Sequence, residues 1–202
     1  MAGGYKLRSI DNEKDPSAAI KRSQGIYVCG GNVFRLLREL RRRGLLEDVR
    51  EAVMEGGIPY LGISAGTVLA CPTICTSNDM PIVDPGVAAG DALGLIDFQI
   101  NAHFFGGDFY SQDPVTGKFQ VHFGMNRVER IREFLEDVSD DAPVPVVGLA
   151  EGCMLKCEGG KIELLGESFS PPGSPMTIFR KHFTPLEVKD VKGKDLAPLI
   201  RG

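Results

Sequence analysis

Hydrophobic and polar positions along the chain alternate between short continuous apolar runs and longer stretches with helical spacing. Four of the apolar runs have the length of strands: Gly25 to Cys29, Ile58 to Ile63, Phe98 to Asn101 and Val144 to Leu149. Continuous runs of this kind are typical of strands that are buried on both faces, as in parallel sheets. They predict the central strands of a sheet covered by helices.

The stretches between these runs predict the covering helices. After Asn32, a good N-cap residue, apolar positions recur at helical spacing until Gly44 ends the helix,. Leu46 to Glu55 and the amphipathic segment Arg127 to Asp137 follow the same pattern, and Asp15-Pro16 begins a brief helix through Lys21,. Strands that alternate with helices indicate an α/β fold with a mostly parallel, open sheet.

The remaining segments predict smaller features. Tyr5 to Ile10 is expected to form a short strand, and Gly106 to Gly124 an exposed excursion with two turns,. Cys153 to Cys157 and Lys161 to Leu165, joined by Gly159-Gly160, predict a small antiparallel hairpin near the C-terminus, and Thr177 to Arg180 a strand that closes this small sheet,. No linker or repeat divides the chain, so residues 1–202 are expected to form one domain.

Composition narrows the function classes. The 202 residues are 43% hydrophobic and 25% charged, with a net charge of −4 that gives no general attraction to nucleic acid or anionic membranes,. No run reaches the roughly 20 apolar residues that span a bilayer, and Met1 to Arg8 lacks the apolar stretch of a secretory signal,. Five cysteines without a disulfide framework suit a reducing compartment,. We therefore expect a cytoplasmic protein.

The run Gly62-Ile63-Ser64-Ala65-Gly66 carries the strongest chemical signal. A serine nucleophile must be exposed, deprotonated and paired with donors for the oxyanion. A sharp strand-to-helix turn exposes Oγ, and it needs small neighbours such as those on both sides of Ser64,. The simpler interpretation is a glycine-rich turn in which Ser64 only caps a helix. A second glycine-rich strand end, Cys29 to Asn32, lies at the same predicted sheet edge, and its amides would complete an oxyanion hole,.

A general base and an orienting acid are needed beside such a serine. Of the three histidines, His103 is favoured because it lies just beyond a strand end, whereas His122 lies in the loop excursion and His182 in the C-terminal tail,. Glu151 follows the strand that ends at Leu149, and Asp79 lies downstream of the nucleophile helix. The residues alone do not choose between these two acids.

Several longer stretches resemble peptidase E, the family of serine α-aspartyl dipeptidases whose fold is related to class I glutamine amidotransferases. The matching stretches are GGNVFRLL (30–37), GISAG (62–66), ACPTICTSNDMPIVDP (70–85), FQINAHF (98–104), NRVERIREF (126–134) and VGLAEG (147–152). The resemblance runs from about residue 5 to 188 and implies a Ser-His-Glu triad of Ser64, His103 and Glu151. It also implies oxyanion donors at the Gly31 and Ala65 amides.

The resemblance further implies hydrolysis of dipeptides with an N-terminal aspartate, without metal or organic cofactor. Arg127 matches a basic residue of the family and would bind the aspartate β-carboxylate,. Asn32 would hold the substrate's amino group or carboxylate, and Asp79 would have a structural or substrate-binding role. Alternative functions are a cyanophycinase-like β-aspartyl peptidase and a non-catalytic protein that binds acidic peptides.

The sequence departs from the family in two places. The chain begins where the family's third strand would be, so we expect a homodimer that covers the exposed sheet edge, or a rearranged N-terminal segment. The loop between His103 and Arg127 is longer than usual, which predicts a broadened preference beyond N-terminal aspartate.

Overall fold

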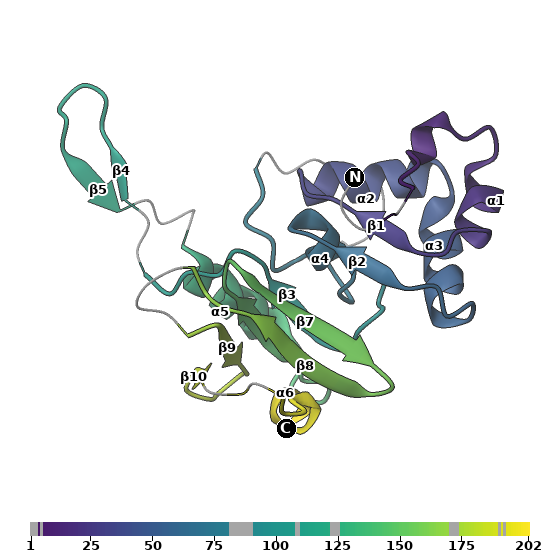
Figure 1. Ribbon diagram of the computed structural model, residues 1–202. Helices are drawn as coiled ribbons and strands as arrows, with labels where there is room; N and C mark the ends of the chain where they lie inside the picture. The colour runs from purple at the N-terminus through teal and green to yellow at the C-terminus, as the bar shows by residue number, and fades with distance from the viewer. Residues whose placement is uncertain are drawn as a thin grey trace.

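The computed structural model describes residues 4, 6–80, 91–107, 110–121, 126–169, 174–189, 191 and 193–202. Its first part pairs β1 (Ile26–Val28) in parallel with β2 (Tyr60–Gly62), with Ile26 opposite Tyr60. Four helices accompany this pair (Figure 1): α1 (Pro16–Lys21), α2 (Val33–Arg42), α3 (Leu45–Met54) and α4 (Ala65–Leu69).

Local chemistry fixes the ends of these helices as the sequence predicts. Asp15 accepts a hydrogen bond from the Ala18 amide at the start of α1, and Asn32 Oδ1 accepts one from the Arg35 amide at the start of α2,. Gly44 separates α2 from α3 in the left-handed conformation, at φ 67°,. The buried faces of the helices form the first hydrophobic core, which includes Val33, Leu37, Leu45, Val49, Ala52, Val68 and Leu69.

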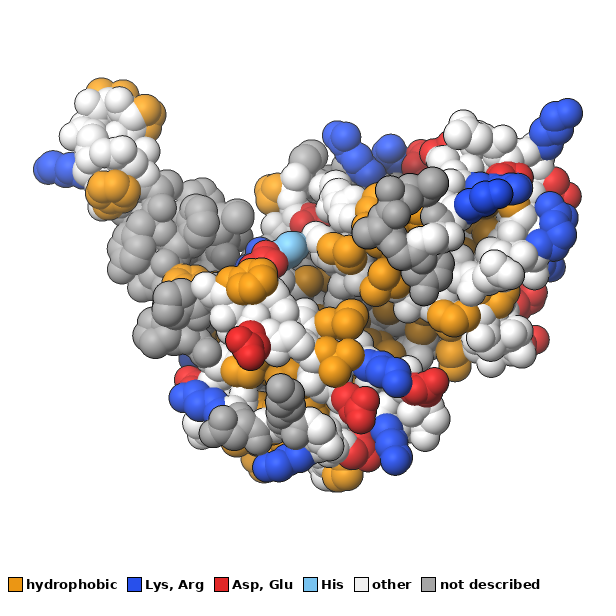
Figure 2. All heavy atoms as spheres, viewed as in Figure 1, with side chains coloured by type: hydrophobic (Ala, Val, Ile, Leu, Met, Phe, Trp, Pro, Cys, Tyr) orange, Lys and Arg blue, Asp and Glu red, His pale blue; other side chains and the backbone are white. Residues whose placement is uncertain are grey.

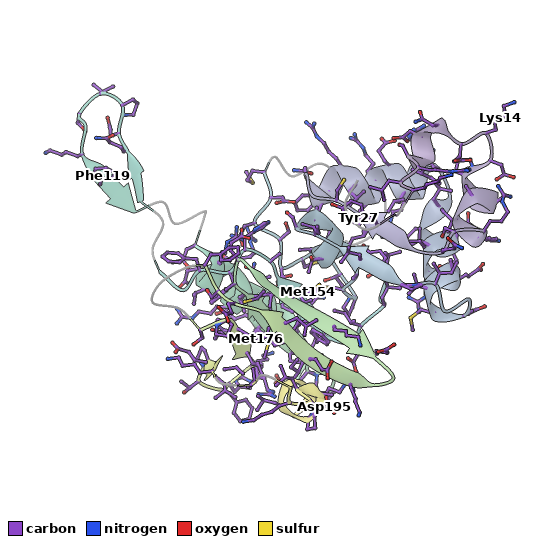
Figure 3. All side chains as sticks on the ribbon, viewed as in Figure 1. Lys14, Tyr27, Phe119, Met154, Met176 and Asp195 are labelled. Carbon is purple, nitrogen blue, oxygen red and sulfur yellow. The ribbon has the colours of Figure 1, made fainter. Side chains whose placement is uncertain are left out.

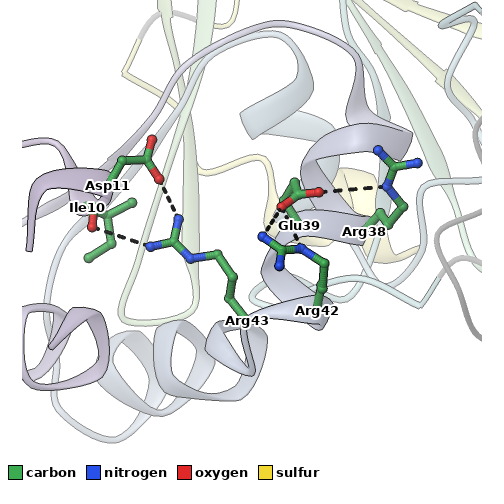
Figure 4. Close-up of polar contacts among 6 residues, drawn as sticks. All are labelled: Ile10, Asp11, Arg38, Glu39, Arg42 and Arg43. Atoms are coloured by element: carbon green, nitrogen blue, oxygen red, sulfur yellow. Dashed lines mark hydrogen bonds and ion pairs between the residues drawn. The ribbon is translucent and has the colours of Figure 1, made fainter. Parts of the chain in front are cut away.

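The outer face of α2 is arginine-rich but carries its own counter-charges (Figure 4). Arg42 forms two hydrogen bonds to Glu39, at 3.0 and 2.8 Å, and Arg38 lies 3.9 Å from the same carboxylate. Arg43 reaches the 3₁₀ turn η1 (Ile10–Asn12) and pairs with Asp11. This face is therefore a solvated surface cross-linked by ion pairs.

A four-stranded sheet forms the second part, in the order β10 (Leu186–Val188), β9 (Met176–Phe179), β6 (Val146–Leu149) and β3 (Gln99–Asn101). β3 and β6 are parallel, and β9 and β10 extend the sheet in antiparallel fashion. Helix α5 (Arg127–Asp137) packs Ile131 and Leu135 against Phe104 and Phe179. Parallel strands and flanking helices confirm the predicted α/β class.

Two hairpins complete the described structure. β7 (Cys153–Glu158) and β8 (Lys161–Gly166) form the predicted C-terminal hairpin, next to which lies helix α6 (Ala197–Arg201). β4 (Tyr110–Gln112) and β5 (Phe119–Val121) form a hairpin that projects from the body (Figure 1).

Two local predictions were wrong. The strand expected at Thr177 to Arg180 pairs as β9 with β6 and β10, not with the C-terminal hairpin, because its fully buried side chains require a sheet that is covered on both faces. The strand expected at Tyr5 to Ile10 is absent from its described residues. Ser9 Oγ accepts a hydrogen bond from the Asp11 amide instead and starts the 3₁₀ turn,.

The two parts meet along β3, through the segment 71–78. The Ile100 amide donates to Cys71 Sγ at 3.2 Å, and Thr76 Oγ1 donates to the Ile100 carbonyl at 3.2 Å. Asn101 Nδ2 donates to the Thr76 carbonyl at 2.6 Å. These contacts satisfy the edge of β3 and bring its carboxyl end beside that of β2. In the described portion of the chain, none of the helices has the length and apolar character to cross a membrane.

Candidate active site

Ser64 stands on a strained turn between β2 and α4. Its backbone has φ 56° and ψ −113°, a conformation that residues with a side chain rarely adopt,. The turn is tight enough that a Cβ on Gly30 would lie 3.1 Å from Ser64 Cβ, and one on Gly62 would lie 2.4 Å from the Gly66 carbonyl oxygen. The half-buried Tyr60 hydroxyl donates to that same carbonyl at 2.7 Å. The small residues of the motif are thus required by the shape of the turn.

His103 lies beside Ser64, at the end of β3. Its Nε2 is 2.7 Å from Ser64 Oγ, and its Nδ1 is hydrogen-bonded to Glu151 Oε1. Glu151 follows β6, the parallel neighbour of β3, so the two residues reach the same sheet edge. His103 also has a positive φ, of 58°. The structure therefore brings together serine, imidazole and carboxylate in one hydrogen-bonded series, as general-base activation requires.

The rival residues make other contacts. Asp79 Oδ2 accepts a hydrogen bond from the Val33 amide at 2.7 Å, which caps the start of α2,. His182 is exposed and pairs with Asp140, and His122 lies outside the described residues. The geometry selects Glu151 as the acid next to His103, a choice that the residues alone had left open.

Two backbone amides, those of Gly31 and Ala65, are the expected oxyanion donors. Gly31 follows β1 with φ 134°, in a conformation that favours glycine, and Ala65 is the first residue of α4. Among the described residues, no acceptor takes a hydrogen bond from the backbone amide of Gly31 or of Ala65. Asn32 is engaged through Oδ1 as the cap of α2, so its expected role in substrate binding stays a prediction.

Arg127 is the first residue of α5, and its side chain reaches the end of β3. Its Nη1 donates to the Ala102 carbonyl at 2.9 Å and lies 3.4 Å from Asn101 Oδ1. Burial lowers the pKa of the guanidinium, and the carboxylates of Asp79 and Glu151 oppose that shift. Arg127 is thus a partly buried cation held in place by β3.

Ser64, His103 and Arg127 line one narrow pocket. The pocket also includes Asn78, a residue that the sequence does not single out. Residues that line it include Ser64, Ala65, Asn78, Asp79, His103 and Arg127. Asn78 precedes Asp79 in the segment that joins the two parts of the fold, and nothing in the local pattern marks it as a pocket residue. Within the described residues, no three His, Cys, Asp or Glu side chains converge as metal ligands.

Comparisons with known proteins place this arrangement in context. Residues 2–165 match the model of Peptidase family S51. Over 197 residues the chain is 41% identical to Peptidase E of Streptomyces coelicolor, covering 98% of this chain and 71% of that protein. It is 43% identical to Peptidase E of Salmonella newport, and 38% identical to a Drosophila melanogaster protein named "Probable alpha-aspartyl dipeptidase".

The last two matches cover 81% of this chain and 64% and 62% of the respective relatives, so the chain spans less than two thirds of either. A solved structure from Listeria monocytogenes EGD-e, which carries a provisional peptidase E assignment, superposes with a TM-score of 0.53 at 23% identity. The superposition covers 75% of this chain and 64% of the Listeria chain, and it supports the fold alone.

Proposed function

The chain belongs to peptidase family S51, as predicted from its motifs, and from this serine-peptidase family and the site geometry we propose that it hydrolyses dipeptides with an N-terminal aspartate. The observation that carries the proposal is the hydrogen-bonded series of Ser64, His103 and Glu151, whose serine and histidine line one pocket with Arg127. The first three residues supply the reaction, and the arginine supplies a reason for an acidic substrate. The name of the Drosophila relative points to the same substrate class.

The proposed reaction proceeds through an acyl-enzyme. His103 Nε2 takes the proton from Ser64 Oγ as that oxygen attacks the peptide carbonyl carbon, and Glu151 holds the imidazole through Nδ1,. The amides of Gly31 and Ala65 donate to the oxyanion. His103 then returns the proton to the leaving amine, and water attacks the ester with His103 again as the base.

Two charged groups account for recognition of the first residue. The Arg127 guanidinium pairs with the β-carboxylate of the substrate, since a planar fork of donors matches a carboxylate. Asp79 lines the same pocket and carries the opposite charge, which suits the free α-ammonium group of a dipeptide. The capping bond to Val33 uses one Asp79 oxygen and holds the carboxylate in place for that contact.

The test is hydrolysis of four dipeptides by the wild type and by Ser64→Ala. Asp-Leu, Asn-Leu, Leu-Leu and a β-aspartyl dipeptide are incubated separately, and the released amino acids are quantified. We expect cleavage of Asp-Leu that is abolished in the variant. Additional cleavage of Asn-Leu would reveal the broadened specificity expected from the loop between His103 and Arg127. Cleavage of the β-aspartyl substrate alone would favour a cyanophycinase-like activity, and turnover of none would favour a non-catalytic acidic-peptide binder.

We also propose a homodimer. Tyr27 on β1 and Leu61 and Ile63 on and after β2 are each about half exposed, at 48%, 46% and 48%. Figure 2 shows hydrophobic side chains over this pair and over β7–β8, and the labelled Tyr27 and Met154 lie on this side in Figure 3. A parallel pair with an apolar open face favours burial against a partner. Light scattering should give twice the chain mass, and Leu61→Glu should give the monomer.

A cytoplasmic location and a single domain over residues 1–202 complete the proposal. All five cysteines are free thiols, which fits a reducing compartment,. Limited proteolysis should leave both parts of the fold together, and fractionation of cells should find the protein with soluble enzymes.

A further inference from the structure

Asn78 is a buried polar side chain with an unused donor at the candidate active site. The residue is 9% exposed, and its Nδ2 has no hydrogen-bond partner although it is shielded from solvent. A buried donor without an acceptor destabilises the folded state. Because such groups are rare in folded proteins, this one calls for an acceptor, and an oxygen of a ligand in the adjoining pocket would supply it,.

The orientation of the Asn78 amide is fixed by its neighbours. Asn101 Nδ2 donates to the Thr76 carbonyl at 2.6 Å, because a carbonyl oxygen only accepts hydrogen bonds,. Asn101 Oδ1 accepts from Arg127, because a guanidinium only donates,. Asn101 therefore presents Nδ2 to Asn78, and Asn78 must answer with Oδ1, at 3.0 Å. A flipped Asn78 would place two donors against each other. Its Nδ2 is thus the end left for another acceptor.

We propose that Asn78 Nδ2 is a specificity-determining donor that binds the side-chain carboxylate of the substrate's first residue. This inference rests on the proposed function. Asn78 lines the same pocket as Ser64 and Arg127, and Asn101 touches both Asn78 and Arg127. Asn101 is the positioning residue that holds the cation and the neutral donor toward one ligand. A carboxylate has enough lone pairs for both.

This pairing gives a reason for rejecting a neutral substrate of the same shape. An asparagine side chain offers one carbonyl oxygen, and its amide nitrogen would face a donor. The two protein donors would then have to share that one neutral oxygen, or one of them would stay unpaired in a buried site, which discriminates more strongly than a poor fit of apolar surface. On this proposal, an acidic first residue supplies the acceptor that Asn78 Nδ2 lacks among the described residues.

The experiment compares Asn78→Ala and Asn78→Asp with the wild type. Asn78→Ala removes both ends of the amide, whereas Asn78→Asp keeps the acceptor toward Asn101 and replaces the donor by a negative charge. A hydrogen bond to a charged group is worth about 1.5–3 kcal/mol, so kcat/KM for Asp-Leu should fall about 10- to 100-fold in Asn78→Ala. The Kd of L-aspartate, measured by calorimetry, should rise by the same factor. Asn78→Asp should lose at least as much.

Two controls separate recognition from folding and from the reaction itself. Thr76→Val removes a buried hydrogen bond to Ile100 in the same segment, outside the pocket lining. It should lower the melting temperature and leave the Kd of L-aspartate unchanged. Acylation of Ser64 by p-nitrophenyl acetate, a small neutral ester, should fall much less than Asp-Leu cleavage in Asn78→Ala.

The outcomes are distinct. If the wild type cleaves Asp-Leu and Asn78→Ala binds L-aspartate equally well, the inference is overturned and the proposed function stands; a lowered melting temperature alone would assign Asn78 to folding or to a buried water. If p-nitrophenyl acetate acylation falls together with Asp-Leu cleavage, Asn78 acts on the reaction and not on specificity. If the wild type neither cleaves Asp-Leu nor binds L-aspartate, the proposed function itself fails.

Discussion

Replacing Gly66 by alanine would place a methyl group against the backbone of β1. The added Cβ would lie 2.1 Å from the Val28 carbonyl oxygen and 2.9 Å from its carbon. Real Cβ atoms essentially never come closer than 3.0 Å to another heavy atom. Because the obstacle is backbone and not a mobile side chain, α4 must withdraw from β1 by roughly 1 Å, a displacement that is able to cost about 100-fold in rate at a catalytic residue.

The direction of the effect opposes that of helix propensity. Alanine favours a helix over glycine by about 1 kcal/mol, so an unobstructed substitution in α4 would stabilise the protein. Overpacking typically costs about 1–3 kcal/mol, and here it falls next to Ser64. We therefore expect Gly66→Ala to lower the free energy of unfolding by about 1–2 kcal/mol and kcat for Asp-Leu by about 100-fold.

Gly25→Ala provides the matched control. A Cβ there would lie 3.8 Å from the Pro59 carbonyl oxygen, an ordinary contact, at the start of the same β1. Urea denaturation and Asp-Leu hydrolysis are measured on both variants and the wild type. Full activity in Gly66→Ala would refute the reasoning, as would an equal loss in Gly25→Ala.

Three further predictions concern the acids and the turn. Glu151→Gln should lower kcat by about 10⁴-fold with KM nearly unchanged, because the imidazole loses its orienting carboxylate. Asp79→Asn should mainly raise KM. The opposite pattern in steady-state kinetics would make Asp79 the orienting acid and Glu151 the substrate-binding one. Tyr60→Phe should reduce the free energy of unfolding in urea by about 1 kcal/mol, since it removes the partly buried hydrogen bond to the Gly66 carbonyl,; an unchanged midpoint would contradict this. Two backbone amides lower the pKa of Asp195, so the stabilisation from this carboxylate is present above its pKa in the unfolded chain and is lost as pH falls through its pKa in the folded protein,. The melting temperature of Asp195→Asn should therefore fall less than that of the wild type between pH 6 and pH 3. Parallel plots of melting temperature against pH for the two proteins would refute this.

The sequence predicts the residues of the site best where they follow strands. Ser64, His103 and Glu151 each lie two residues beyond the end of a strand that an apolar run predicts, and parallel strands bring such positions to one edge,. The choice between Glu151 and Asp79 depends on which carboxylate reaches the imidazole. That depends on the path of the loop after α4, which no local pattern encodes.

Asn78 escapes prediction for a different reason. An asparagine in a loop is ordinarily a turn residue, and its burial results from the long-range contact with Asn101 on β3. The misplaced strand at Thr177 to Arg180 has a similar origin, because a short apolar run fits any sheet that offers it a covered position. Pairing partners that are distant in sequence decide both cases.

The hydrogen bond between Ser64 and His103 links two halves that have separate hydrophobic cores. We expect warming to loosen the contacts of segment 71–78 with β3 before either core melts, because this seam lies between the two cores and its polar contacts are individual hydrogen bonds,. Heat inactivation of the enzyme is then set by the seam, and activity disappears below the temperature at which the chain unfolds. Directed evolution toward heat tolerance would find its useful substitutions along this boundary, and filling either interior more tightly would leave the working temperature where it is.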